Sequence, residues 1–176
     1  MNGLLIAITG YSGSGKDTVA DDLIQRYGFV KKTFAEPLKR AIQILFDFTD
    51  QQLYGTQDDK SQVDPRWMVT PRGVMQWLGT DIIRKQFDPD FWVKHFELTH
   101  NNAMNIVVSD LRFVNEALLI KKLGGTIIRI NRHTNEDQHV SETEMDCIVP
   151  DVIINNHGSL DDLFQHIDCV INTLNK

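Results

Sequence analysis

Short apolar runs alternate with amphipathic stretches along most of the chain. The runs at 4–8, 106–108 and 152–154 are continuously apolar, which is typical of strands buried on both faces of a parallel sheet. Two further strands are predicted at 29–34 and 126–130. Strands that alternate with helices indicate an α/β protein with a five-stranded parallel sheet. In such proteins ligands bind beyond the carboxyl ends of the strands.

Helix signals fill the intervals between these runs. Apolar residues at helical spacing end at Gly28, which suits the first position after a helix. Pro37 and Pro71 each open a further helix, and Asp90 is the expected N-cap of another. The remaining helices are expected at 114–123 and behind a capping box of Ser159 and Asp162. Residues 50–70 are polar and poorly periodic, so we interpret them as a mobile connection.

Composition and charge exclude several classes of protein. A chain of 176 residues with 41% apolar residues can bury a core of its own as one domain. The formal net charge of -6 does not favour nucleic-acid binding, which depends on a basic surface. No apolar run approaches the roughly 18 residues of a membrane span, and no targeting segment is visible. We therefore expect a cytoplasmic protein that contacts neither nucleic acid nor membrane.

A glycine-rich loop follows the first predicted strand. Residues 10–16 read Gly-Tyr-Ser-Gly-Ser-Gly-Lys, which matches the phosphate-binding pattern G-x-x-x-x-G-K. Glycines let backbone N–H groups turn toward phosphate oxygens, and the N-terminus of the next helix attracts the same anion. Lys16 adds a point charge for the β- and γ-phosphates of ATP. The ATP-binding residues expected from this loop are Ser12, Gly13, Ser14, Gly15, Lys16, Asp17 and Thr18.

The loop departs from the common pattern at its eighth position. Asp17 stands where Ser or Thr is usual, and Thr18 follows it. A carboxylate beside a polyphosphate is repelled unless Mg²⁺ or its water shell lies between them. Asp17 is therefore assigned to Mg²⁺ or to the acceptor phosphate, and Thr18 to phosphate or metal. Asp110, at the end of the apolar run 106–108, is a second candidate ligand of Mg²⁺.

The other motifs narrow the class of phosphate-loop protein. The chain has no Asn-Lys-x-Asp and no Asp-x-x-Gly, which argues against a GTPase switch and leaves a small-molecule kinase. Basic residues stand near the starts of predicted helices, where cations are unfavourable by roughly 0.3–1 kcal/mol each. These residues are Lys39, Arg40, Arg72 and Arg112. Such placements suggest anion sites in which a base and a helix end act together.

A polar stretch after the strand at 126–130 is expected to form a small lid. Arg132 stands at its start, where it can reach the transferred phosphate as an arginine clamp. His133, His139 and Cys147 do not have the spacing of a zinc site.

Several segments in the same order resemble the deoxynucleoside monophosphate kinases of bacteriophages, within the P-loop nucleoside monophosphate kinase superfamily. Besides the loop, they are 34–39, 72–81, 91–93, 109–116 and 139–142. The segment Met75–Asp81 (Met-Gln-Trp-Leu-Gly-Thr-Asp) is the most specific, whereas the phosphate loop is shared with many families. The resemblance covers nearly the whole chain. The connection at 47–70 is short for the group.

This resemblance implies a fold and a reaction. The fold is a three-layer α/β P-loop domain whose core comprises 1–34, 105–130 and 148–176, with a helical monophosphate-binding insertion at 35–104 and a lid at 131–147. The reaction is transfer of the γ-phosphate of ATP, with Mg²⁺, to a deoxynucleoside 5′-monophosphate for DNA precursor synthesis. The host-cell cytoplasm is the implied location, and a homodimer is compatible with the family.

The resemblance also assigns roles to single residues. The catalytic set is Lys16, Asp17, Arg72, Arg112 and Arg132. Lys39 joins Arg72 and Arg112 at the acceptor phosphate. The base and sugar pocket is formed by Phe34, Gln76, Trp77, Asp81 and Trp92, and the substrate-binding set also includes Asp110 and Glu116. For the two tryptophans, an ordinary core position is at least as good an interpretation. His139, Ser141 and Glu142 follow the family pattern in the lid, and Asn155 and Gly158 are placed near the adenine.

Two other functions stay open at this point. One is another phosphate-loop kinase, acting on dephospho-coenzyme A or phosphomevalonate, which would leave Met75–Asp81 without a reason. The other is an ATP-binding switch that transfers no phosphate. A panel of acceptors separates the first from the monophosphate kinase, and ATP consumption without any monophosphate would favour the second.

Overall fold

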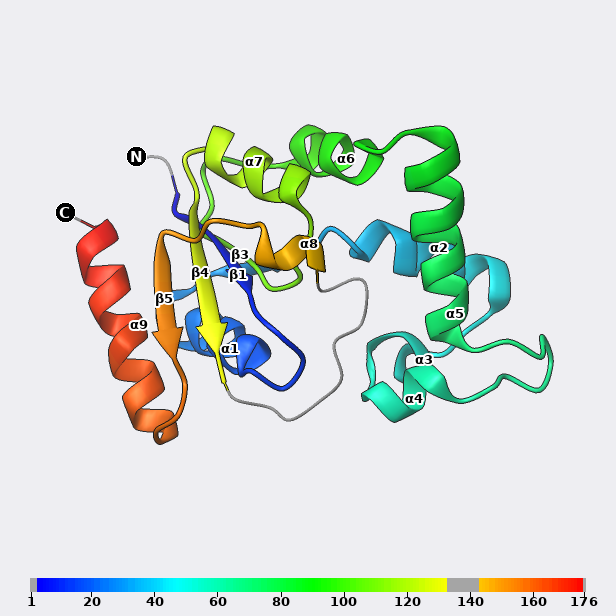
Figure 1. Cartoon of the computed structure of the whole chain (residues 1–176), viewed down its shortest axis with the longest axis horizontal. Helices are drawn as coiled ribbons and strands as arrows, with labels where there is room; N and C mark the ends of the chain where they lie inside the picture. The colour runs from blue at the N-terminus through cyan, green and yellow to red at the C-terminus, as the bar shows by residue number, and fades with distance from the viewer. Residues whose placement is uncertain (1–2, 133–142, 176) are drawn as a thin grey trace. The chain divides into compact units, whose positions relative to one another are not determined.

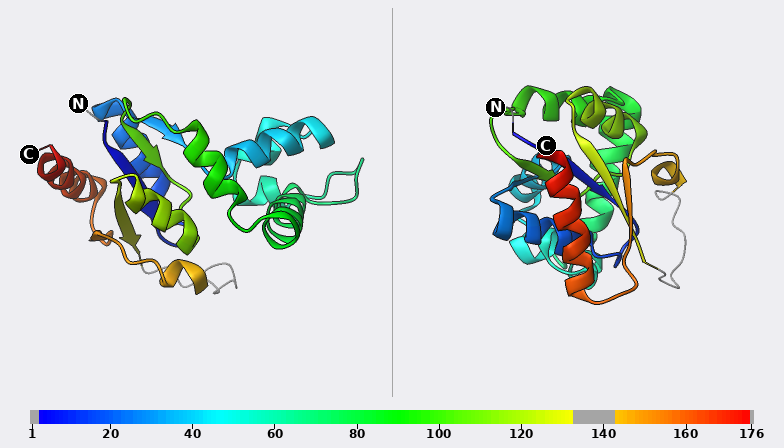
Figure 2. Two further views of the ribbon diagram at one scale, coloured as in Figure 1. Left: turned by 90° about the horizontal axis from the view of Figure 1, so that it is seen from above. Right: turned by 90° about the vertical axis from the view of Figure 1, so that its left-hand side faces the viewer.

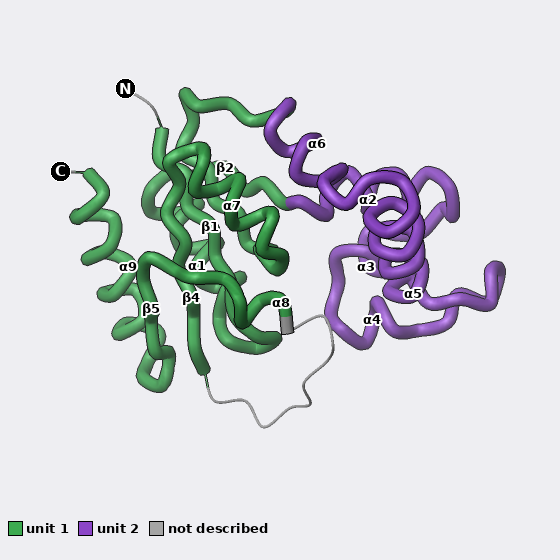
Figure 3. Tube along the Cα trace, turned by 45° about the horizontal axis from the view of Figure 1, so that its top comes forward, with its two compact units in different colours: residues 1–33, 99–176 green, residues 34–98 purple. Residues whose placement is uncertain are grey.

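The computed structural model describes residues 3–132 and 143–175. The backbone forms two compact units, one made of Met1–Thr33 with Thr99–Lys176 and the other of Phe34–Leu98 (Figure 3). The first unit carries a sheet and the second is helical. Each unit has its own cluster of buried apolar side chains. In the part of the chain that is described, no helix has the length and apolar character needed to cross a membrane.

All five strands of the sheet run parallel, in the spatial order β2-β3-β1-β4-β5 (Figure 1). They are β1 (Leu5–Thr9), β2 (Val30–Lys32), β3 (Ile106–Val108), β4 (Thr126–Asn131) and β5 (Val152–Asn155). Ala7 in β1 pairs with Val108 on one side and with Ile127 on the other. The central strand is buried along its whole length, as its continuous apolar run predicted. The predicted five-stranded parallel α/β fold is therefore confirmed.

Helices cover both faces of this sheet (Figure 2). The helices of the first unit are α1 (Lys16–Tyr27), α7 (Val114–Lys122), α8 (Thr143–Asp146) and α9 (Leu160–Leu174). α1 and α9 pack on one face, where Ile6 and Ile8 of β1 are fully buried against them, and α7 packs on β1 and β4. Each such buried side chain contributes about 1.5–3 kcal/mol.

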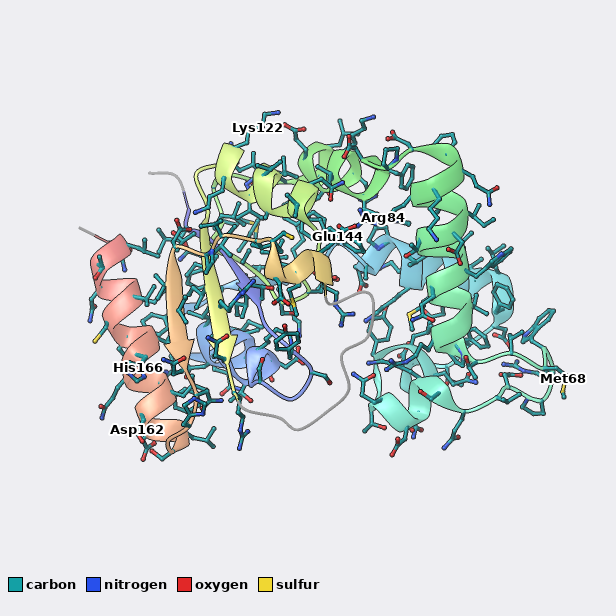
Figure 4. The ribbon with its side chains drawn as sticks, viewed as in Figure 1. Met68, Arg84, Lys122, Glu144, Asp162 and His166 are labelled. Atoms are coloured by element: carbon teal, nitrogen blue, oxygen red, sulfur yellow. The ribbon has the colours of Figure 1, made fainter. Side chains whose placement is uncertain are left out.

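The ends of these helices follow the signals in the sequence. α1 ends at Gly28, whose φ of +69° is left-handed and whose N–H donates to the carbonyl of Ile24. α9 begins with the predicted capping box, in which Ser159 and Asp162 satisfy each other's backbone N–H groups. Asp162 lies at the first turn of α9 in Figure 4.

The second unit packs short helices around one apolar cluster. They are α2 (Glu36–Phe46), α3 (Asp50–Tyr54), α4 (Gln57–Ser61), α5 (Pro71–Gln76), the π-helix η1 (Trp77–Phe87) and α6 (Phe91–Thr99). The cluster consists of Leu38, Ile42, Phe48, Leu53, Val74 and Trp92. Pro71 opens a helix as predicted, but that helix continues as a π-helix. At its end the N–H of Asp88 donates to the carbonyl of Ile83, five residues earlier.

The interpretation of residues 50–70 as a mobile connection is wrong. α3 and α4 lie within this stretch, and the side chains of Thr49 and Thr56 cap them in two capping boxes. Each helix has five residues, which is too short to show helical periodicity in the sequence. The following turn is held by Asp64, which is buried and accepts hydrogen bonds from Arg66 and Gln52. Local hydrogen bonds thus order a segment that has no apolar pattern.

Candidate active site

The glycine-rich loop connects β1 to α1, in the middle of the sheet's carboxyl edge. Gly10, Gly13 and Gly15 have φ values of +146°, +74° and +104°, which L-residues with side chains rarely adopt. A Cβ at Gly10 would lie 2.4 Å from the carbonyl oxygen of Ile130 in β4. Glycine is therefore required by both conformation and space, and the backbone curves as a phosphate-binding loop does.

α1 begins directly after the loop. Gly15 is the N-cap residue, and no side chain caps the first turn. Unpaired N–H groups and the positive end of the helix dipole together attract an anion. The Lys16 ammonium donates to the carbonyl of Tyr11, with 2.7 Å between nitrogen and oxygen. This contact holds the lysine side chain against the loop.

Two buried hydroxyls accompany the loop. Thr9 ends β1 and Ser14 lies in the loop, and both residues are almost completely buried. Among the residues that the structure describes, neither hydroxyl oxygen has a hydrogen-bond partner. A buried polar group without a partner costs about 1–3 kcal/mol. Ser14 therefore fits a site completed by a polar ligand.

The donors expected for Mg²⁺ are oxygen atoms from three residues. The Asp17 side chain is 79% exposed, and one of its oxygens lies 3.6 Å from the Lys31 ammonium. Thr18 and Asp110 are partly buried. Mg²⁺ prefers such oxygen ligands and usually keeps waters and substrate phosphates in its shell. No cluster of three or more His, Cys, Asp or Glu able to hold a metal occurs within 3–132 and 143–175. The oxygen atoms of Asp17, Thr18 and Asp110 are of the kind that Mg²⁺ accepts as ligands.

Glu116 supports the turn that presents Arg112. Its side chain is 2% exposed, and its Oε2 accepts hydrogen bonds from the backbone N–H groups of Arg112 at 3.1 Å and Phe113 at 3.2 Å. The side chain of Arg112 is exposed. These bonds give Glu116 a positioning role in the turn before α7. Contact of Glu116 with a substrate stays a prediction.

The segment expected to form the lid is described only in part. His133, His139, Ser141 and Glu142 lie outside the described residues, and Arg132 is exposed. On the other side of that gap, α8 is tied to the loop because the Tyr11 hydroxyl donates to the carboxylate of Asp146 at 2.7 and 2.9 Å. The guanidinium of Arg129, in β4, donates to the carbonyls of Met145 and Ile148. The hydroxyl of a loop residue therefore contacts the helix at the end of this segment.

Asn156 is a loop-contacting residue that the sequence did not reveal. Its side-chain amide Nδ2 donates to the carbonyl of Ser14 at 2.9 Å, and its backbone N–H donates to the carbonyl of Asn131 at 2.7 Å. The neighbours proposed from the sequence, Asn155 and Gly158, are exposed. The alternation of strand side chains was the available signal, because Ile154 and Asn156 are buried on either side of exposed Asn155.

A groove of about 680 Å³ lies between α1 and α9, and Thr18 is one of its lining residues. The charged side chains that line it are Asp21, Asp22, Arg26, Asp161 and Asp168. Four carboxylates against one guanidinium repel a polyphosphate, so this groove is not the phosphate site.

Four predicted substrate residues of the second unit present polar groups or an exposed ring. Arg72 is partly buried, and its Nε has no hydrogen-bond partner in the described part of the chain. Gln76, one turn further on α5, is exposed, and Trp77 is 51% exposed. The Lys39 ammonium lies 4.6 Å from the centre of the Tyr54 ring, a cation–π distance.

The other three predicted substrate residues of the second unit are packed or paired within it. The ring of Phe34 stacks on Phe96 at 4.6 Å, and Phe34 is buried. Trp92 is 6% exposed, and its indole N–H donates to the carbonyl of Gly79. Asp81 forms an ion pair with Lys85 at 2.7 Å. Trp92 is thus a core side chain in this structure, and the contact of these residues with a base or sugar stays a prediction.

Comparisons with known proteins point to one family. The family model for deoxynucleotide monophosphate kinase matches residues 51–167. A protein of Acanthamoeba polyphaga mimivirus, provisionally named deoxynucleotide monophosphate kinase, is 40% identical over 187 residues, covering 96% of this chain and 97% of the relative. The deoxynucleotide monophosphate kinase of Enterobacteria phage T4 is 24% identical over 241 residues, covering 97% and 99%. That of Escherichia phage RB69 is 31% identical over 118 residues, covering 63% and 48%.

Solved structures are more distant. An APS kinase of Mycobacterium tuberculosis has a TM-score of 0.47 and 13% identity, with 97% of this chain and 98% of that chain covered. A sugar kinase of Janibacter has a TM-score of 0.43 and 12% identity, with 94% and 92% covered.

Proposed function

Because the chain belongs to the deoxynucleotide monophosphate kinase family, we propose that it transfers the γ-phosphate of ATP to a deoxynucleoside 5′-monophosphate. The products are ADP and the deoxynucleoside diphosphate, and the latter is a precursor for DNA synthesis. The observation that carries this proposal is the loop between β1 and α1. Its three left-handed glycines, the uncapped start of α1 and the ammonium of Lys16 form a receptor for a polyphosphate.

The proposed step is a displacement at phosphorus. An oxygen of the acceptor phosphate forms a bond to the γ-phosphorus, and the bond from that phosphorus to the β,γ-bridging oxygen breaks, so that ADP leaves. The acceptor phosphate is ionised at pH 7, so no general base is needed. Catalysis then consists of positioning and of neutralising charge by Lys16, Arg72, Arg112 and Arg132. When bound, Mg²⁺ neutralises further phosphate charge, and Asp17, Thr18 and Asp110 are the residues that would hold it.

The acceptor is proposed to be bound by residues that the sequence indicated. Lys39, Arg72 and Arg112 bind its phosphate, and the orphaned Nε of Arg72 supports this assignment because a buried guanidinium nitrogen requires an acceptor. Gln76 and Trp77 offer an exposed amide and an exposed ring to the nucleoside. Phe34, Asp81 and Trp92 shape the pocket, and Asp110 and Glu116 complete the substrate-binding set.

Location and assembly are two further expectations. The relatives come from a mimivirus and from bacteriophages, which supports action in the cytoplasm of an infected cell. A homodimer stays a prediction that sedimentation analysis can test.

A panel of acceptors tests the proposed reaction. ADP release is followed with ATP–Mg²⁺ and each of dAMP, dCMP, dGMP and dTMP, and with their ribose counterparts. We expect ADP formation that depends on one or more deoxynucleotides, and the ranking then defines the pocket. ADP release with none of them, but with dephospho-coenzyme A or phosphomevalonate, would assign the chain to a different acceptor class.

A further inference from the structure

We propose that Asn156 is a positioning residue for the phosphate loop: its side-chain amide fixes the Ser14–Gly15 peptide so that the Gly15 N–H points toward the bound phosphate. This inference deepens the proposed function and rests on it. None of the sequence patterns assigned a role to Asn156. Its place after β5 is far from the loop along the chain, but adjacent to it in the structure.

The contact between Asn156 and the loop is short and shielded from water. The amide nitrogen of Asn156 lies 2.9 Å from the carbonyl oxygen of Ser14, and the side chains of both residues are buried. A Cβ at Gly15 would lie only 2.7 Å from the same amide nitrogen. The backbone N–H of Asn156 donates to the carbonyl of Asn131, the last residue of β4. Asn156 is therefore held by the sheet while its side chain holds the loop.

The geometry of a peptide group gives this bond a consequence for phosphate binding. In a trans peptide the C=O and the following N–H point in opposite directions within one plane. The Ser14 carbonyl is directed at Asn156, so the Gly15 N–H is directed away from Asn156. No described residue accepts a hydrogen bond from that N–H. Gly15 is also the N-cap of α1, so its N–H stands at the end of the helix that attracts anions.

The chemistry of the amide suits this position. The Ser14 carbonyl needs a donor, and an amide supplies an N–H without adding charge beside a polyphosphate. Without that donor, the peptide is free to rotate and a buried carbonyl loses its partner. Reorienting the peptide at each binding event weakens phosphate affinity, because the loop must then be ordered by the ligand. Asn156 is thus expected to act on ATP through the loop, and not by touching the nucleoside.

The test uses the full chain with Asn156→Ala and Asn156→Asp. Asn156→Asp keeps the shape of the side chain but replaces the donor with an acceptor and adds a negative charge. Asn172→Asp, on the exposed side of α9, is the matched control. Calorimetry measures the affinity for ATP–Mg²⁺ and for inorganic tripolyphosphate, which occupies only the phosphate site. Thermal unfolding establishes that each variant is folded at the assay temperature.

We expect Asn156→Ala to weaken both ligands by about tenfold, which corresponds to one hydrogen bond to a charged group. Asn156→Asp weakens both ligands further, and Asn172→Asp leaves them unchanged. In steady-state assays the KM for ATP rises while the KM for the monophosphate stays the same, a split that a general loss of structure does not produce. If Asn156→Ala does not fold, the isosteric Asn156→Asp carries the test alone.

Two results would overturn the inference. Unchanged affinities in a folded variant would mean that the amide does not position the loop. Weaker ATP binding with unchanged tripolyphosphate binding would mean that Asn156 acts on the nucleoside instead. Failure of the proposed function can be distinguished from failure of this inference, because binding of tripolyphosphate does not involve the deoxynucleoside monophosphate. A chain that binds it as expected, yet phosphorylates no deoxynucleotide, contradicts the proposed function and leaves the role of Asn156 standing.

Discussion

At the scale of single residues, hydrogen bonds between side chains and backbone order the candidate site. The ammonium of Lys16 rests on the carbonyl of Tyr11, and buried Glu116 accepts the N–H groups that precede α7. Asn156 in turn holds the carbonyl of Ser14. Such contacts fix functional groups before a ligand arrives, which limits the reorganisation that binding requires.

Lys16→Ala tests the main charge in the loop. We expect kcat to fall by at least ~100-fold, because a preorganised charge at the transferred phosphate is lost. The glycines keep their conformations, so the thermal stability changes little. Steady-state kinetics and thermal unfolding measure the two effects. Lys122→Ala, on the exposed surface of α7, is the control (Figure 4). If the Lys16→Ala variant has a kcat close to that of the unaltered chain, Lys16 takes no part in the reaction.

Arg72→Ala tests the acceptor site. We expect the KM for the monophosphate to rise by about 10- to 100-fold, the range of a hydrogen bond to a charged group, while the KM for ATP stays the same. Titration of the monophosphate at saturating ATP gives this value. Arg84→Ala in η1, where Arg84 donates to the carbonyl of Pro89, is the control. An unchanged KM for the monophosphate would exclude Arg72 from the acceptor site.

The sequence was a good guide to residues whose type is demanded by backbone conformation. Gly10 and Gly15 were recognisable because the loop requires left-handed backbone and close approach. Asn156 was not, because its role depends on which segment the sheet brings beside the loop. Trp92 shows another limit. The spacing of an aromatic residue within a motif does not tell whether its side chain lies in the core or in a ligand pocket, and in the structure Trp92 lies in the core.

At the scale of elements, capping and ion pairing order the second unit where apolar patterning is weak. The turn from Asp64 to Val69 closes through backbone hydrogen bonds, and Met68 at its tip has a φ of +55° (Figure 4). Arg66 holds Asp64 with two nitrogens of its guanidinium and also reaches Asp47. These bonds replace the hydrophobic contacts that a longer helix would supply.

Asp64→Asn tests this turn through its pH dependence. Hydrogen bonds from Arg66 and Gln52 hold the pKa of the Asp64 carboxyl well below its usual range. The ionised form is therefore stabilised by folding, so its contribution is present above about pH 4, the ordinary pKa of aspartate, and is lost as the pH falls further through the folded pKa. We expect Asp64→Asn to lower the melting temperature at neutral pH. The difference in melting temperature between the variant and the unaltered chain is expected to shrink below about pH 4.

Thermal unfolding of both proteins across the acidic range measures this effect. Asp58→Asn, an exposed carboxylate of α4, is the control. A difference between Asp64→Asn and the unaltered chain that is constant with pH would show that ionisation of Asp64 does not stabilise the turn.

Gly79→Ala tests the packing of η1. Gly79 is buried, and an added Cβ would lie 2.5 Å from Cδ2 of Leu38, which is itself in the core. We expect a loss of about 1–3 kcal/mol in the free energy of unfolding, as for other overpacked cores. Denaturant titration measures it, with Thr80→Ala at the partly exposed next position as control. Equal stability of the Gly79→Ala variant and the unaltered chain would mean that the core yields freely at this point.

Elements with a clear signal in their own segment were predictable, and the short or irregular helices of the second unit were not. β1, β3 and α9 follow from continuous apolar runs and a capping box, which are signals contained within one segment. α3 and α4 depend on single threonine caps, and η1 differs from an α-helix in hydrogen bonding that no residue pattern records. The loop of the candidate site was predictable because, as for β1, its signal lies within one segment. The site residues on α2 and α5 were less predictable, because side-chain packing decides which of them are exposed.

At the scale of the whole molecule, the proposed binding of nucleotides by an acidic chain requires local anion sites. The net charge of -6 gives no general attraction for nucleotides. The proposed phosphate site therefore relies on left-handed glycines, a helix N-terminus and a few bases. The alignment with the phage T4 kinase spans 241 positions, more than the 176 residues of this chain, so that relative carries segments that this chain lacks. The chemistry is accordingly expected from the loop and the motifs that this chain of 176 residues contains.

Transfer of labelled phosphate tests this account most directly. The chain is incubated with ATP labelled at its γ-phosphate, Mg²⁺ and the deoxynucleoside monophosphate that gives the fastest ADP release, and the products are separated. We predict that the label appears as the β-phosphate of the deoxynucleoside diphosphate, in one-to-one ratio with ADP, and that its appearance slows by at least ~100-fold when Lys16 is replaced by Ala. Label released as inorganic phosphate at the same rate with and without the monophosphate would contradict the account and indicate ATP hydrolysis instead.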